Sequence, residues 1–94
     1  MTLRETEAFA EWIAGLGDST VAARIAVRID RLAEGNPGDV RPVGAGVSEL
    51  RVHHGPGFRV YFVRHEGDIV LLLGGTKKTQ SKDIRSAINM AREL

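Results

Sequence analysis

Two stretches of the sequence, residues 49–62 and 74–80, contain the side chains that could bind a ligand or take part in catalysis. The first is typical of a β-hairpin, because apolar and polar residues alternate on both sides of a Gly-Pro-Gly turn. Its polar positions and the end of the next strand supply the candidates, which are Arg51, His53, Arg59, Tyr61, Lys77 and Lys78. A small sheet face with two arginines and a histidine predicts binding of an anion, and the phosphate of RNA is the leading candidate.

These residue types match the needs of RNA cleavage without a metal ion. A base must activate the ribose 2′-OH, cations must stabilise the phosphate, and an acid must protonate the leaving oxygen. Arginine suits the second task and histidine the first or third. Arg51 and His53 are two residues apart, so on a strand they share a face about 7 Å apart. With a regular hairpin register, Arg59 and Tyr61 share that face too.

Each candidate also has a simpler interpretation. Arg51 and Arg59 could be ordinary solvent-facing strand residues, and Tyr61 could cover the sheet or stack on a base. His54 has the parity of a core residue but lies at the turn, so it ranks below His53 and is a candidate for substrate binding only. The histidines lack the acidic partners and spacing of a metal site, so we expect no metal and no cofactor.

Composition places the chain among small soluble domains. Its 94 residues predict one domain over 1–94, and the lack of cysteine excludes disulfide and thiolate chemistry. We expect a cytoplasmic protein with no membrane segment, because the longest apolar run, Ile69–Leu73, is far too short. Residues 1–50 hold five Arg and Lys against eight Asp and Glu, whereas residues 51–94 hold eight against four. The basic half is therefore the half that holds the candidates, as a polyanion-binding surface requires.

Hydrophobic periodicity predicts an α+β domain of order (β)ααβββα. Residues 2–4 are a weak first strand, a helix follows to a cap at Gly17, and a second helix runs from Asp18 or Ser19 to about Glu34. Residues 40–47 are a loop or short strand, and three strands follow at about 48–53, 58–64 and 68–74. Thr79 or Ser81 caps a last helix. Ile69–Leu73 lacks alternation, which predicts a central strand covered on both faces.

The same segments resemble a known family. They are Trp12 in an amphipathic helix, Gly35–Asp39, Val47–Arg51, Gly55–Tyr61, Leu72–Gly75 and Lys77–Gln80 with Asp83 and Ile84, in that order. Taken together, they resemble the RelE/ParE superfamily of bacterial toxins, in particular its HigB-like group of addiction-module killer proteins, also called phage Gp49-like. The resemblance covers nearly the whole chain and implies a RelE-like fold, with an N-terminal helical hairpin packed on a small, mainly antiparallel sheet.

The resemblance implies a toxin of a type II toxin–antitoxin pair that cuts mRNA in the ribosomal A site. By position, the catalytic set of RelE-like members falls on Arg51, His53, Arg59 and either Lys77 or Lys78, of which we choose Lys78. Lys77, Tyr61 and His54 are then the expected substrate-binding residues. The resemblance also implies an antitoxin, of the HigA helix-turn-helix type, and a heterotetramer built through it.

The sequence departs from RelE at one functional position. RelE has a tyrosine in its last helix, where this chain has Ile84, Arg85 and Ser86. Either Tyr61 or His53 takes that role, or catalysis differs from that of RelE. Because the same fold also hosts ParE-like toxins that inhibit DNA gyrase without cleaving anything, a gyrase inhibitor and a non-cleaving RNA-binding relative are the alternatives.

Overall fold

The computed structural model describes residues 2–94 and contains one more strand than the sequence pattern predicts. The elements in chain order are β1 (Leu3–Glu5), α1 (Glu7–Ala14), α2 (Ser19–Ala33), β2 (Val40–Gly44), β3 (Val47–Val52), β4 (Phe58–His65), β5 (Asp68–Thr76), the 3-10 turn η1 (Lys77–Thr79) and α3 (Gln80–Arg92). The order is therefore βααββββα, which adds β2 to the expected (β)ααβββα. β2 pairs with β3, at a position where the sequence pattern allows either a loop or a short strand.

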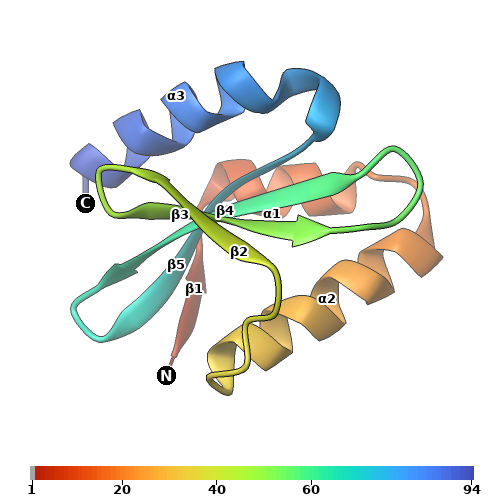
Figure 1. The fold of residues 1–94 in the computed structure, drawn as a ribbon, viewed down its shortest axis with the longest axis horizontal. Helices are drawn as coiled ribbons and strands as arrows, with labels where there is room; N and C mark the ends of the chain where they lie inside the picture. The colour runs from red at the N-terminus through yellow and green to blue at the C-terminus, as the bar shows by residue number, and fades with distance from the viewer. Residues whose placement is uncertain (1) are drawn as a thin grey trace.

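The strands form one mixed sheet in the order β1-β5-β4-β3-β2 (Figure 1). Only the short β1 runs parallel to its neighbour β5, and the other neighbours are antiparallel. β5 lies between β1 and β4, and its residues Ile69 to Leu72 are buried. The prediction of a central strand over Ile69–Leu73 is confirmed, because a strand covered on both faces has no polar positions to alternate.

Helices cover both faces of this sheet (Figure 1). One core lies under α1 and α2 and contains Phe9, Ile25 and Leu32 from the helices with Leu50 and Val60 from the sheet. The other core lies under α3, where Ala87 packs with Val47, Tyr61, Val70 and Leu72. None of the helices in residues 2–94 combines the length and apolar character that a membrane crossing requires.

Local capping sets the helix boundaries, and two of them differ from the sequence expectation. α1 ends earlier than predicted, because the backbone N–H of Gly15 donates to the carbonyls of Glu11 and Trp12, whereas Gly17 follows in a left-handed conformation. α2 begins as predicted after Asp18, whose carboxylate accepts from the second and third helical amides. Thr79 occupies the capping position of α3 but makes no capping bond, and its hydroxyl instead donates to Asp83 at 2.5 Å.

Two glycines at the end of β5 let both helical layers approach the sheet closely. Gly74 and Gly75 are adjacent in the strand and therefore point to opposite faces of the sheet. A Cβ built on Gly74 would overlap the ring of Trp12, and one on Gly75 would overlap the carboxylate of Asp83. The second contact places the start of α3 beside the end of β5, next to the basic residues of η1.

Replacing Gly74 by alanine is expected to lower the free energy of unfolding by about 1–3 kcal/mol, because the added methyl displaces the Trp12 ring from a packed layer. Urea denaturation followed by tryptophan fluorescence measures it. Gly15→Ala is the control, since Gly15 is exposed and has ordinary helical φ of −83°. Equal midpoints for the two variants would contradict the close packing described here.

Candidate functional site

The pairing of β3 with β4 brings four polar side chains together on one face of the sheet. Arg51 lies opposite Arg59, and Glu49 lies opposite Tyr61. The expected register of the hairpin is confirmed. The expected exposure is wrong, because α3 covers much of this face and leaves Arg59 only 6% exposed and Tyr61 fully buried.

Glu49 is the centre of this group and is itself fully buried. One carboxylate oxygen, Oε1, accepts from Arg51 Nε at 2.8 Å and lies 3.9 Å from Arg59 Nε. The other, Oε2, accepts from the Tyr61 hydroxyl at 3.1 Å and from Gln80 Nε2 at 2.9 Å. Gln80 is the first residue of α3, so the carboxylate joins the sheet to that helix.

The electrostatics of the group keep its members in fixed protonation states. Burial raises the pKa of Glu49, but hydrogen bonds from Arg51, Gln80 and Tyr61 outweigh it and hold that pKa below its usual range. Burial, and then the nearby negative charge of Glu49, raise the pKa of Tyr61. Its hydroxyl is therefore a stable donor to Glu49 at neutral pH. The same carboxylate raises the pKa of Arg51 through their hydrogen bond.

Arg59 differs from the other members because its donors are not satisfied. Its Nε and Nη1 atoms are buried and make no hydrogen bond within residues 2–94. Glu49, at 3.9 Å, is near enough for charge attraction but too far for a hydrogen bond. A buried guanidinium with free donors is costly, and in native proteins such a group calls for an explanation, of which a binding role is one. An anionic ligand with oxygen acceptors would satisfy those nitrogens.

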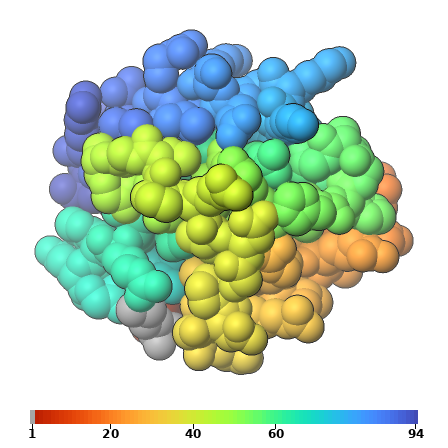
Figure 2. Space-filling view, viewed as in Figure 1, coloured from red at the N-terminus to blue at the C-terminus, as the bar shows by residue number. Residues whose placement is uncertain are grey.

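A concavity of about 520 Å³ lies in front of these arginines. It is lined by Arg51, His53, His54, Arg59, Lys77, Gln80 and the glycines and proline of the β3–β4 loop. Gly57 of that loop has a φ of +82°, which favours glycine, and a Cβ built there would stand 4.0 Å from Arg59 Nη1, so the loop backbone passes close to the guanidinium. Figure 2 shows the green surface of this loop beside the blue surface of α3.

His53 lies at the rim of the concavity and has an acidic partner that the sequence analysis did not foresee. Its Nε2 atom is 2.6 Å from Asp39 Oδ2, and its side chain is 67% exposed. The hydrogen bond with His53 holds the pKa of Asp39 below its usual range. The backbone of Asp39 is also fixed, because its carbonyl accepts from the Arg51 amide at 3.0 Å. The imidazole is thus held in one orientation at the edge of the site.

The two lysines and Tyr61 differ in their position relative to the concavity. Lys77 is exposed and lines the concavity, and its backbone N–H donates to Gly57 at 3.1 Å. Lys78 does not line it and belongs to a neighbouring shallow depression with Pro56, Thr76 and Lys77. Of the two lysines, the expected catalytic Lys78 therefore lies farther from the arginines' concavity than the expected substrate-binding Lys77. Tyr61, expected to meet substrate, has no exposed surface with which to do so.

Three residues of the site were missed by sequence reasoning: Glu49, Asp39 and Gln80. Strand alternation could have identified Glu49, because it lies two residues before Arg51 and opposite Tyr61 in the predicted register. Asp39 reaches His53 across the β2–β3 pair, and Gln80 reaches the group from α3. Those two depend on tertiary contacts without a local pattern. No three His, Cys, Asp or Glu side chains gather to hold a metal ion within residues 2–94.

The fold is shared with a solved protein of similar size. The solution structure of the conserved hypothetical protein HP0894 from Helicobacter pylori matches with a TM-score of 0.54, covering 83% of this chain and 96% of that one. The sequences are 17% identical, so the likeness shows the fold alone. The two proteins therefore share a mixed α+β fold.

Sequence comparison identifies the family within that class. Residues 11–94 match the family described as phage-derived protein Gp49-like. The chain is also 43% identical over 93 residues to an uncharacterized protein of Haemophilus influenzae strain Rd, covering 98% of this chain and 94% of that protein. This chain belongs to the Gp49-like family, which is assigned to the toxins of addiction modules.

Proposed function

We propose that this protein is the HigB-like toxin of a type II toxin–antitoxin pair and that it cuts mRNA on the ribosome without a metal ion. The observation that carries the proposal is Arg59, a buried guanidinium with two unbonded nitrogens beside the concavity that also holds Arg51 and Lys77. A planar donor set with unmet hydrogen bonds, next to two further cations, suits the non-bridging oxygens of a phosphodiester.

In this mechanism the two arginines bind the scissile phosphate and neutralise the charge that develops on it. Glu49 does not touch the RNA, because it is fully buried beneath the arginines. It is a positioning residue that fixes the Arg51 guanidinium by their 2.8 Å hydrogen bond. Tyr61 is likewise a positioning residue and orients the second oxygen of Glu49. No catalytic tyrosine is then needed in α3.

Proton transfer falls to His53, whose ring nitrogen not engaged by Asp39 takes a proton from the 2′-OH or gives one to the leaving oxygen. Lys77 at the opposite rim holds the RNA backbone. His54 contacts the neighbouring nucleotide, and Lys78 meets the strand further along, outside the concavity. The ribosome presents the mRNA in a single-stranded form in which the ribose 2′-OH can attack the adjacent phosphorus.

The partners of this function are the ribosome with its mRNA and a cognate antitoxin of the HigA helix-turn-helix type, and the place of action is the cytoplasm. The toxin–antitoxin pair assembles as a heterotetramer through the antitoxin.

The test is primer extension on mRNA from cells that briefly express the chain, together with cleavage of a defined mRNA on programmed ribosomes in Mg²⁺ buffer. The purified protein is dialysed against EDTA, and then freed of EDTA, before it is added to the ribosomes. We expect cuts within translated codons that require the ribosome and that the dialysed protein still makes. Growth arrest with intact mRNA would reject the nuclease and direct the search to gyrase.

His53→Ala is expected to reduce single-turnover cleavage by about 10²–10⁴-fold, because the proton-transfer group is lost. Asp39→Asn should reduce it less, since the imidazole stays but loses its orienting carboxylate. His65→Ala is the control, because His65 pairs with Glu66 away from the concavity. An unchanged cleavage rate in His53→Ala would assign proton transfer to another group.

A further inference from the structure

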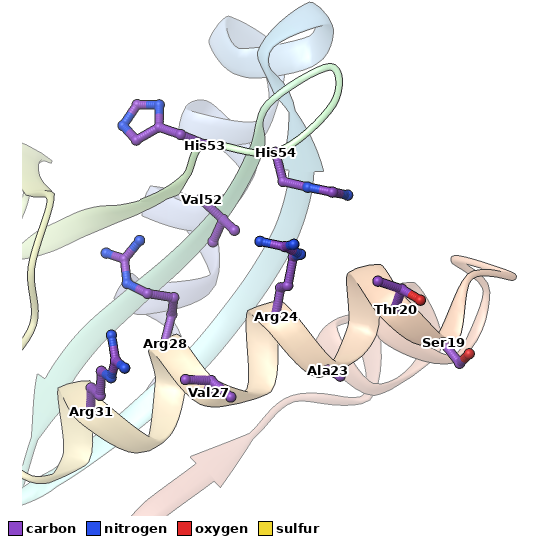
Figure 3. A pocket seen from close by; sticks show the side chains of 10 residues that line it. All are labelled: Ser19, Thr20, Ala23, Arg24, Val27, Arg28, Arg31, Val52, His53 and His54. Carbon is purple, nitrogen blue, oxygen red and sulfur yellow. The ribbon is translucent and has the colours of Figure 1, made fainter.

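A second concavity, of about 720 Å³, lies on the sheet face that α2 covers (Figure 3). We call it the α2 groove. Its main walls are Arg24, Val27, Arg28 and Arg31 of α2 and Val52 and His54 at the end of β3. The candidate RNA site faces α3, so the β3–β4 loop separates the two hollows and only His53 and His54 line both.

Arg28 makes the base of the α2 groove rigid. Its Nη1 donates to the Arg51 carbonyl at 2.6 Å, and its Nη2 donates to the Pro37 carbonyl at 3.0 Å. These bonds tie α2 to β3 and to the segment that leads into β2. Arg28 is therefore occupied by the fold, and the groove exists before anything binds in it.

Arg24 and Arg31, by contrast, are exposed, and their guanidinium groups make no hydrogen bond or ion pair within the described chain. They are seven residues apart, which places them two turns apart on the same side of α2. Val27 lies between them and is 48% exposed, and it is one of two large apolar side chains with such exposure in residues 2–94. No acidic side chain lines the groove. The result is an apolar strip flanked by free cations.

We propose that the α2 groove binds an acidic, amphipathic segment of the antitoxin. The identification of the partner as the antitoxin rests on the proposed function. Carboxylates on the segment pair with Arg24 and Arg31, and its apolar side chains cover the exposed Val27. The apolar strip favours a protein occupant over RNA, whose backbone would contact the cations and leave Val27 uncovered. A segment bound in the α2 groove extends to His53 and His54 at its rim and leaves the site around Arg51 and Arg59 uncovered.

The test uses the full chain and a synthetic 21-residue helical peptide with leucine and glutamate spaced for this groove. A matched peptide has lysine in place of every glutamate. We expect the glutamate peptide to bind with salt-sensitive affinity and the lysine peptide to bind at least about tenfold more weakly. The double variant Arg24→Glu, Arg31→Glu should weaken the glutamate peptide at least about tenfold. Arg85→Glu, Arg92→Glu is the matched control, because these exposed arginines are also seven residues apart on a helix.

The same variants are assayed for mRNA cleavage, and for suppression of cleavage by the antitoxin, so that the two proposals fail separately. Cleavage retained by Arg24→Glu, Arg31→Glu together with loss of suppression supports the α2 groove. If the unmodified protein binds the peptide but cleaves no mRNA, the proposed nuclease activity is rejected and the proposed binding role of the α2 groove is retained. Equal peptide affinity in the variant and its control, or loss of binding to a single-stranded RNA oligonucleotide instead of the peptide, would overturn the proposal.

Discussion

Replacing Arg59 by glutamine is expected to reduce mRNA cleavage by at least about a hundredfold while the protein stays folded. The loss follows because Arg59 lines the concavity and has two unbonded nitrogens, and because glutamine cannot reproduce its charge or its fork. The fold should survive because Glu49 keeps its hydrogen bonds to Arg51, Tyr61 and Gln80. Removing two unsatisfied buried nitrogens also removes a desolvation cost.

The measurement is single-turnover cleavage on programmed ribosomes, with thermal unfolding of each variant recorded in parallel. Arg59→Lys separates charge from geometry, and we expect it to recover only a small part of the rate because an ammonium cannot bind two phosphate oxygens in one plane. Lys82→Gln, an exposed change on α3 outside the concavity, is the control. A folded Arg59→Gln protein that cleaves at the unmodified rate would remove Arg59 from the mechanism.

Replacing Glu49 by alanine is expected to lower the free energy of unfolding by about 3–5 kcal/mol, which is a large part of the stability of a domain of this size. The change leaves Arg51 and the largely buried Arg59 without their counter-charge and removes the acceptor of Tyr61 and Gln80. Glu49→Gln should cost less, since its amide oxygen still accepts one hydrogen bond. Urea denaturation measures both, with the exposed Glu11→Ala as control.

The pH dependence of stability provides a second measure of the same carboxylate. The pKa of Glu49 in the folded protein lies below its ordinary value of 4.5. As the pH falls below that value, the unfolded chain binds the proton first, so stability decreases until Glu49 protonates in the folded protein too. At neutral pH the contribution is fully present. Between pH 6 and pH 3, unmodified protein should therefore lose stability more steeply than Glu49→Gln, and parallel curves would contradict the depressed pKa.

The order and type of most elements could be predicted from the chain alone. Helical periodicity identified the hairpin of α1 and α2, and the Gly-Pro-Gly turn set the register that places Arg51 opposite Arg59. β2 was ambiguous, because a five-residue strand with a proline and a bulge carries little alternation. The early end of α1 was missed because two glycines could each have ended that helix.

The site was predictable only in part. Residue type and strand parity selected Arg51, His53 and Arg59, which the fold does gather around one concavity. Parity could not reveal which sheet face α3 covers, so Tyr61 was assigned to the surface although it is buried. The two lysines are neighbours in sequence, and only the turn of η1 directs Lys77 and not Lys78 to the concavity.

By itself, the sequence determined that this protein is a small α+β domain with its cations concentrated in the strand-forming half, because periodicity and charge are properties of the chain. Tertiary structure decided which cations of the chain are held and which are free. Arg28 is occupied by backbone carbonyls and Arg51 by Glu49, whereas Arg59 keeps two unbonded nitrogens. The division depends on contacts between elements, because Arg28 bonds carbonyls on other segments of the chain and α3 covers the sheet face that holds Arg59, and no local pattern encodes these contacts.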